Sequence, residues 1–263
     1  KSSMLLLAMT LGITAANAQM SGSYTIDPSN AGAATATMFK NWNSFVKSLY
    51  NVSATVNPRT DGGPNVVGNA TVSGPVTVTV VSTNATPETV TLSFAPVTGV
   101  SSTNTITIDG NYQTFNFGTT AYAPFQFTGI DYLTIKNLTL VNASTTPGGF
   151  WFNNQSDYNT LSNVKVSFSA LASASSLVSY VAFSTSSSSA TSSGSVATGS
   201  TGQPGSFNTI DGCTFETTNT NSPGPYYAIS LNGNSSNYST VAQNNSFINN
   251  KITNFYYYGL YQY

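Results

Sequence analysis

A short phrase recurs along this chain without ever being an exact copy. In each copy a short apolar strand is followed by a turn residue, an aromatic residue and a second strand. The copies are 125–127 with 131–135, 150–152 with 157–161, 181–183 with 207–210, 229–231 with 237–241, and a fifth that opens at 258–260. Repetition of this kind constrains the fold more than any other feature of the sequence.

The spacing of the copies indicates stacked units rather than one closed core. The central apolar residues Phe127, Phe152, Phe183 and Leu231 are 25, 31 and 48 residues apart, and Ile229 and Leu260 are 31 apart. Periods in this range are typical of solenoids, in which each repeat packs on its neighbours. Short strands with period-2 alternation between turn residues fill each unit. The repeat therefore predicts an all-β coil, and the third spacing is long because a Ser-rich loop, 184–206, interrupts that copy.

Composition excludes several classes of partner and chemistry. Only 6% of the 263 residues are charged and the net charge is −1, so we expect no nucleic-acid partner. The chain has no His and a single Cys, which excludes imidazole bases, His-based metal sites and Cys-based zinc sites. We therefore predict no metal and no cofactor. Cys213 occupies the place that Leu138 and Val164 take in earlier copies, so we expect a buried thiol that packs as a small hydrophobe.

The N-terminus predicts export. Lys1 precedes an apolar run from Met4 to Ala16, and a small-residue cleavage site ends at Ala18. We read 1–18 as a signal peptide and expect no membrane span, because the run is shorter than the roughly 20 residues that a spanning helix needs. The predicted location is secreted, either extracellular or at the cell surface.

One amphipathic helix is predicted over 37–50. Its apolar residues lie on one face at helical spacing, and they are Phe39, Trp42, Phe45, Val46 and Leu49. We interpret it as a cap on the open end of the coil, since Lys40 and Lys47 are too few for a membrane-surface helix. The predicted organisation is an N-terminal strand, capping helix and loop over 19–73, followed by the coils over 74–263. Asp-Gly turns at 109–110 and 211–212 and an Asn-Gly turn at 232–233 leave a β-sandwich as the alternative, which the repeat disfavours.

The order of these parts resembles a known family. A signal peptide, the strand at 23–26, the helix, the segments 74–80 and 103–110, and coils such as 131–140 and 245–254 are similar to the N-terminal portion of secreted right-handed parallel β-helix repeat proteins of Bacteroidota type. That family is related in fold to the pectin-lyase superfamily. The resemblance implies a right-handed parallel β-helix, and further repeats or a C-terminal sorting domain downstream.

Carboxylates are the first catalytic candidates. If the copies stack in register, Asp131 and Asp157 lie one coil apart, at roughly the 5 Å spacing of neighbouring strands. Such a pair could serve a retaining glycosidase or begin a calcium site, but the same position is a turn entry, which Asp caps through its own backbone. Lys136 or Lys165 could act as the base of a β-elimination. Asn residues at the bends, including Asn137 and Asn163, are expected to form side-chain ladders.

Tyrosines near the end of the chain are the predicted binding residues. Tyr256, Tyr257 and Tyr261 could stack on sugar rings, although burial beneath a further coil is the alternative. The predicted function is an extracellular or cell-surface scaffold or adhesin that binds a glycan and is not an enzyme. A polysaccharide lyase or glycoside hydrolase, with its catalytic residues mostly downstream of residue 263, is the runner-up. Ice binding is a third class and would require a regular outward Thr-x-Thr ladder, which only 77–79 and 105–107 offer.

Overall fold

The computed structural model describes residues 19–50, 55–65, 71–118, 123–144, 148–169, 178–184, 204–218, 224–232 and 242–262. In this part of the chain nearly all regular structure is β, with one short helix. The strands form three sheets, and every pair of neighbouring strands within them is parallel. The predicted all-β class is therefore confirmed for these residues.

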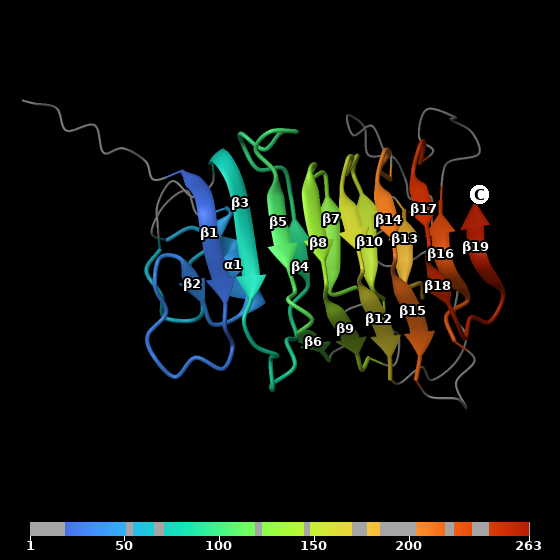
Figure 1. The fold of residues 1–263 in the computed structure, drawn as a ribbon, viewed down its shortest axis with the longest axis horizontal. Coiled ribbons are helices and arrows are strands. Elements are labelled where there is room, and N and C mark those ends of the chain that lie inside the picture. The colour runs from blue at the N-terminus through green and yellow to red at the C-terminus, as the bar shows by residue number, and fades with distance from the viewer. Residues whose placement is uncertain are drawn as a thin grey trace, which may run out of the picture.

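The largest sheet has eight strands and runs the length of the molecule (Figure 1). From the N-terminal edge its order is β2 (Met38–Phe39), β1 (Met20–Ile26), β3 (Val72–Val80), β5 (Ile106–Asp109), β8 (Leu133–Lys136), β11 (Thr160–Ser162), β14 (Thr209–Asp211) and β17 (Ser246–Ile248). The strand at the start of the described chain, β1, thus belongs to the same sheet as the repeats and pairs directly with β3.

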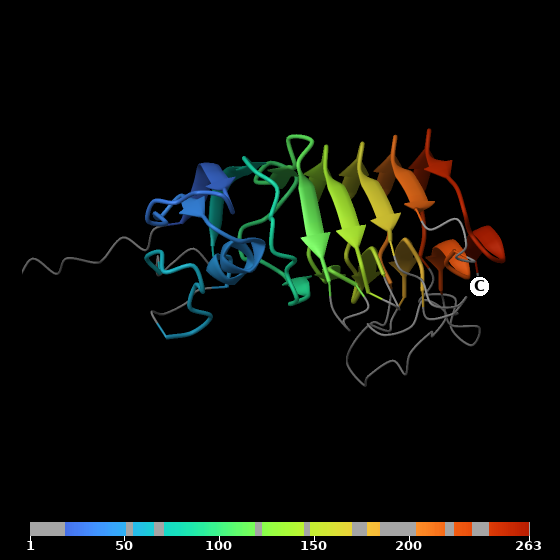
Figure 2. The same cartoon turned by 90° about the horizontal axis from the view of Figure 1, so that it is seen from below.

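The other two sheets contain six and five strands. The six-stranded sheet is β4 (Leu92–Phe94), β7 (Phe125–Thr128), β10 (Phe150–Asn153), β13 (Val181–Phe183), β16 (Tyr227–Leu231) and β19 (Tyr258–Gln262). The five-stranded sheet is β6 (Thr114–Phe117), β9 (Thr139–Asn142), β12 (Lys165–Phe168), β15 (Thr214–Thr217) and β18 (Lys251–Ile252). Figure 2 shows strands of successive coils side by side within the sheets.

The chain visits the three sheets in a fixed rotation. From β7 onward each turn runs through the six-stranded, then the eight-stranded, then the five-stranded sheet. This arrangement is compatible with a parallel β-helix. The Asp-Gly segments at 109–110 and 211–212 lead from the eight-stranded to the five-stranded sheet and do not close hairpins, while Gly233 of the third candidate turn lies outside the described residues. Since all described strand pairs are parallel, the β-sandwich alternative is wrong.

The predicted register of the repeat is confirmed at its central apolar positions. Phe127, Phe152, Phe183 and Leu231 are cross-strand partners, and Ile229 pairs with Leu260. Ring centroids of Phe127 and Phe152 lie 4.4 Å apart, and those of Phe152 and Phe183 lie 4.5 Å apart. Because each ring is fully buried, this stack forms a continuous core along the coil axis.

The prediction for the second strand of the fourth copy is wrong. The second strand of the fourth copy was expected at 237–241, which lies outside the described residues. The strand that pairs with β14 is instead β17, with Ile210 opposite Phe247. The position equivalent to Asp131 in that coil is therefore Gln243.

The bends between the eight- and five-stranded sheets share one backbone conformation. Asn137, Asn163, Gly212 and Asn249 have φ values of 53°, 54°, 63° and 53° at equivalent positions. Asn and Gly tolerate this left-handed region better than other residues. The Asn163 amide donates to Asn137 Oδ1 at 2.9 Å, and Asn137 donates to Asp109 Oδ1 at 3.0 Å. The predicted side-chain ladder at the bends is confirmed there.

A second ladder of amides is buried at the entry to the eight-stranded sheet. Asn159 and Asn208 are fully buried, and Asn245 follows them in the next coil. The N–H of Asn159 donates to Asn208 Oδ1 at 2.8 Å, and the N–H of Asn208 donates to Asn245 Oδ1 at 2.8 Å. Each amide therefore satisfies a backbone group of the preceding coil, which would be costly to bury unpaired.

The helix is shorter than predicted. Helix α1 spans Trp42–Ser48, with Asn41 as its N-cap, while Phe39 lies in β2. Trp42 packs against Phe115 and Phe125, with ring centroids 5.0 and 5.5 Å apart. The helix therefore covers the N-terminal end of the stacked core, at the blue end of Figure 2.

A buried ion pair between Arg59 and Asp61 stabilises the segment 55–65, which follows this helix in the chain. Arg59 binds both carboxylate oxygens of Asp61, and its guanidinium lies 4.2 Å from the centre of the Phe39 ring. It also donates to the carbonyls of Thr35 and Met38. A Cβ on Gly63 would lie 2.4 Å from the guanidinium, so any larger residue there would have to displace Arg59 from its bonds. The single arginine of the chain is thus a structural residue.

Candidate functional site

Asp131 and Asp157 lie together, as predicted, at the turns that enter β8 and β11. Asp131 Oδ1 accepts the backbone N–H of Asp157 at 2.8 Å, and Asp157 Oδ1 accepts the backbone N–H of Ser206 at 2.7 Å. Ser206 continues the ladder, because its hydroxyl accepts the N–H of Gln243 at 3.1 Å. These contacts support the turn-capping role of the two carboxylates.

The surroundings of Asp131 offer little room for a substrate. Burial raises the pKa of Asp131; the N–H of Asp157 opposes that rise, and the Asp157 carboxylate adds to it. The hollow beside Asp131, lined by Pro96, Val97 and Gly129 among others, measures about 60 Å³. Small-molecule sites usually occupy roughly 300 Å³ or more, so this hollow suits water molecules and not a sugar ring.

The two candidate lysines lie in different sheets. Lys136 lies in the eight-stranded sheet and its Nζ is 3.1 Å from Asp109 Oδ2. Lys165 lies in the five-stranded sheet and its Nζ is 2.9 Å from Glu216 Oε1. Neither ammonium points to a shared centre with Asp131 and Asp157, so the described residues do not assemble an elimination site.

A rank of hydroxyl groups on the eight-stranded sheet is the most regular polar feature of the molecule. Every strand except β2 contributes one residue, and register pairs them in order as Ser23, Thr77, Thr107, Thr134, Thr160, Thr209 and Ser246. Their neighbours along each strand are largely buried, whereas these side chains are partly or fully exposed. None of the seven hydroxyl groups makes a hydrogen bond to another residue that the structure describes. The rank therefore faces outward with its donors and acceptors open to a ligand.

Sequence reasoning missed this rank except at Thr77 and Thr107. The signal is present in the repeated phrase, because Thr134, Thr160 and Thr209 each directly precede the central apolar residue of their strand. Thr105, by contrast, does not belong to the rank. Only the parallel pairing of successive coils shows that these hydroxyls line up.

A second outward rank lies two residues further along each strand and is mixed in character. It reads Thr25, Thr79, Asp109, Lys136, Ser162, Asp211 and Ile248. Asp109 accepts from the Asn111 N–H, the Asn137 amide and Lys136, and together these outweigh burial and hold its pKa below the ordinary value. The ice-binding alternative needs a regular second rank of hydroxyls, and charges interrupt it from β5 onward.

Stacked aromatic rings border the hydroxyl rank where the strands begin. Ring centroids of Tyr132 and Tyr158 are 5.1 Å apart and those of Tyr158 and Phe207 are 5.0 Å apart, with interplanar angles of 6° and 9°. All three residues have positive φ at the bend. Parallel stacking hides the inner ring faces, so the rings present their edges and the tyrosine hydroxyls to solvent.

The predicted binding tyrosines lie at the C-terminal end of the six-stranded sheet. Tyr256 and Tyr257 are exposed, and Tyr261 is half-buried. Tyr257 stacks on Tyr226 at 5.1 Å, and Tyr261 stacks on Tyr227 at 4.2 Å. Tyr257 and Tyr261 therefore each have a ring face covered by another tyrosine, whereas Tyr256 meets Tyr226 at a tilt of 37°. The three predicted residues form a cluster separate from the hydroxyl rank.

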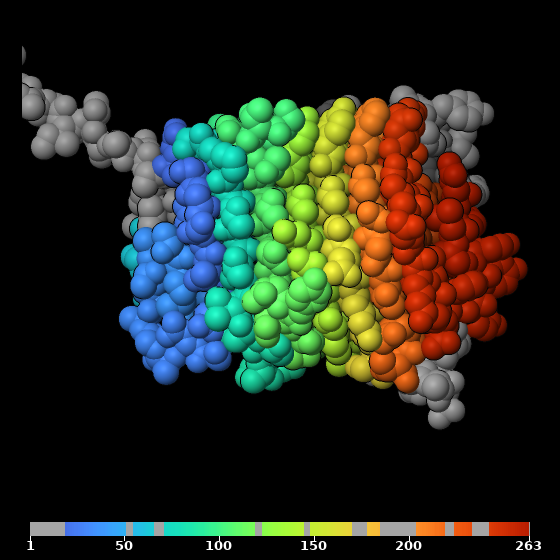
Figure 3. Space-filling model, in the orientation of Figure 1, coloured from blue at the N-terminus to red at the C-terminus, as the bar shows by residue number. Residues whose placement is uncertain are grey.

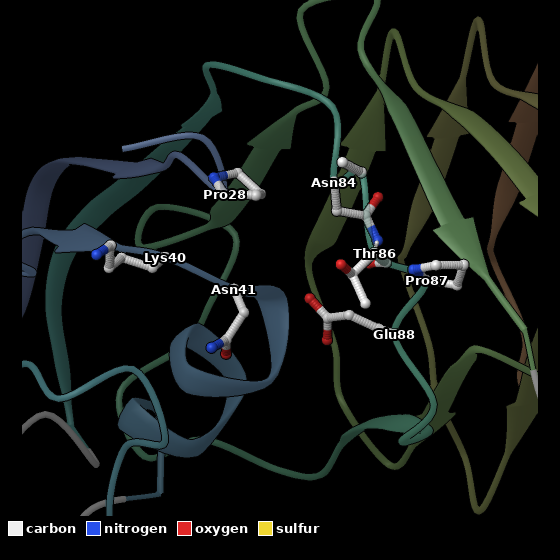
Figure 4. A pocket seen from close by; sticks show the side chains of 8 residues that line it. Pro28, Lys40, Asn41, Asn84, Thr86, Pro87 and Glu88 are labelled. Carbon is white, nitrogen blue, oxygen red and sulfur yellow. Dashed lines mark hydrogen bonds between the residues drawn. The ribbon is translucent and has the colours of Figure 1, made fainter. Parts of the chain in front are cut away.

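A polar hollow of about 310 Å³ separates α1 from the first coil (Figure 4). Glu88 points to the first turn of the helix and accepts the N–H groups of Trp42 at 2.7 Å and Asn43 at 3.2 Å. Burial raises the pKa of Glu88, against the lowering effect of these two donors. The amide of Asn84 is bonded to the backbone of Asn116. The carboxylate of Glu88 and the amide of Asn84, which line the hollow, are thus already bonded to protein groups.

Cys213 is buried, as expected from its place in the repeat. It belongs to the main core, and burial raises the pKa of its thiol to about 11. Such a thiol is protonated at neutral pH and is a poor nucleophile.

Comparisons with known proteins assign no family. No protein-family model matches the chain, and no curated protein and no solved structure matches it either. Among the described residues, no helix is both long and apolar enough to cross a bilayer, and no three His, Cys, Asp or Glu side chains gather as a metal site would require.

Proposed function

We propose that this protein is a secreted, non-enzymatic β-helix scaffold that binds glycans at the cell surface. The observation that carries the proposal is the rank of seven outward hydroxyls, bordered by stacked aromatic rings. Hydroxyls both donate and accept hydrogen bonds, as sugar hydroxyls do, and the exposed ring edges and tyrosine hydroxyls beside them add apolar contact and further hydrogen-bonding groups. The face is extended and open, which suits a polymer better than a small molecule.

The coils of this scaffold turn right-handed, because crossover connections between parallel strands of one sheet are right-handed in about 98% of cases. With that hand, the rotation through three sheets supports the resemblance to pectin-lyase-like β-helix proteins of Bacteroidota type. Export rests on the signal peptide 1–18, which lies outside the described residues. Cleavage before Gln19, read by N-terminal sequencing of the protein recovered from the medium, tests that part of the proposal.

The contacts of the carboxylates favour binding over catalysis. Asp131 and Asp157 cap turns, and Lys136 and Lys165 form separate ion pairs. A lyase or hydrolase needs an acid or base within hydrogen-bond reach of its substrate, and both carboxylates already accept backbone N–H groups of the neighbouring coil.

A polysaccharide panel tests the function. The protein is incubated with neutral and acidic polysaccharides, and both retention on the polymer and the release of reducing or unsaturated ends are measured. Retention without new chain ends is the expected result. Cleavage that disappears in Asp131→Asn or Asp157→Asn would contradict the non-enzymatic proposal, and absence of retention on every polymer would contradict glycan binding.

A further inference from the structure

The charge on the hydroxyl-bearing face limits which glycans it can accept. Between β5 and β17, the second outward rank of this face carries the carboxylates Asp109 and Asp211. The turns that enter β8 and β11 carry two more, Asp131 and Asp157. The same region carries one ammonium, Lys136, and that group is already paired with Asp109. Four negative groups against one positive group leave this face with an acidic character.

Anionic polymers need a different surface. Uronates and sulfates are recognised by charge-assisted bonds from Arg or Lys, and the most specific of these are bidentate bonds from Arg. The only arginine is buried with Asp61 in the N-terminal segment. An acidic polysaccharide on this face would therefore meet like charge without a cation to compensate.

The repeat of the face also sets a direction for a bound polymer. Successive coils form bands side by side along the long axis of the molecule (Figure 3). Along this axis a ligand meets a hydroxyl on every strand, at about 4.8 Å intervals. Across the axis it meets an aromatic ring, one hydroxyl and then a charged or mixed rank. Only the first path offers the same chemistry at each step.

We propose that the outer face of the eight-stranded sheet selects neutral, linear glycans, which lie along the hydroxyl rank across successive strands. This inference rests on the proposed glycan-binding function and adds the class and orientation of the ligand. Sugar hydroxyls replace water at Thr134, Thr160 and their equivalents, while the carboxylates on either side repel acidic chains.

The variant that tests the site is Thr134→Val with Thr160→Val, which removes two adjacent hydroxyls and keeps side-chain shape. The matched control is Thr139→Val with Thr214→Val on the five-stranded sheet, where both residues also face partly outward and occupy one rank. Binding of a neutral β-glucan oligosaccharide and of an oligogalacturonate is measured by calorimetry for the wild type and both variants.

We expect the wild type to bind the neutral oligosaccharide more tightly. The Thr134/Thr160 variant should lose about tenfold in affinity, which corresponds to about two hydrogen bonds, and the control should change little. Equal or tighter binding of the oligogalacturonate would overturn the selectivity, and equal effects of variant and control would overturn the location. Both results leave glycan binding itself intact. No binding of either sugar would overturn this inference, and only a failure of retention on the whole polysaccharide panel would overturn glycan binding as well. Circular dichroism of each variant confirms that it is folded.

Discussion

Single charged residues in this protein are used mainly to hold backbone in place. Arg59 and Asp61 are buried together, and Glu88 binds two N–H groups at the start of α1. In a chain with only 6% charged residues, each such group satisfies polar backbone that would otherwise be buried unpaired. Loss of a buried ion pair is therefore expected to lower the free energy of unfolding more than loss of an exposed one.

Asp61→Asn is expected to cost about 3–5 kcal/mol of unfolding free energy near neutral pH, because it leaves the Arg59 charge buried without its partner. Glu216→Gln breaks a half-exposed pair with Lys165 and should cost less than about 1 kcal/mol. Urea titrations of the two variants beside the wild type measure the difference. Equal losses would contradict the structural role of Arg59.

The same pair predicts a dependence on pH. Although burial opposes ionisation, Arg59 and two backbone N–H donors hold the pKa of Asp61 below its ordinary 3.8. The folded protein therefore releases this proton more readily than the unfolded chain does. The stabilisation is present above about pH 3.8 and is lost as pH falls through the lowered pKa of Asp61 in the folded protein. The difference in unfolding free energy between the wild type and Asp61→Asn should therefore become smaller in acid.

At the scale of strands and bends, amide ladders set the geometry of each coil. Asn163 has φ of 54° and donates to Asn137 Oδ1, so it supplies both a tolerated backbone conformation and a bond between coils. Asn163→Ala is expected to lose about 1–2 kcal/mol, from strain in the left-handed region and from the missing bond. Asn163→Gly relieves the strain and should lose less. Thermal unfolding of both variants gives the order, and greater stability of the alanine variant would contradict this account of the bend.

Sequence alone predicts the elements whose register is carried by large apolar residues. Phe127, Phe152 and Phe183 recur at matching places, and their rings stack as the phrase indicates. The predicted helix is too long because Phe39 fits its periodicity by chance, while Asn41 caps the helix two residues later. The fourth repeat was misplaced because two similar polar stretches lie close together, at 237–241 and 243–247, and only pairing with β14 distinguishes them.

The candidate site was predictable only in part. Asp131 and Asp157 stand out as charged residues in a nearly uncharged repeat, so the sequence locates them, but their bonds to the N–H groups of Asp157 and Ser206 require coordinates. The hydroxyl rank consists of common residues, and a single Thr in a strand carries no signal. Its regularity emerges only when seven strands far apart in sequence are placed in one sheet.

At the scale of the whole molecule, stacking of coils converts a weak local feature into an extended surface. Seven hydroxyls spaced by about 4.8 Å span about 29 Å, far longer than one sugar ring. A glycan chain that lies along this rank gains contacts with each added unit, while the entropy of association is lost only once. Affinity should therefore depend on the length of the ligand.

The most direct test of this account is the affinity of the wild-type protein for a series of neutral oligosaccharides of increasing length, measured by calorimetry. We predict that affinity rises with each added sugar and reaches a plateau once the chain spans about 29 Å. An affinity that stops rising after two or three sugars would show that the ligand occupies a local pocket, and would contradict the assignment of the whole hydroxyl rank as the binding face.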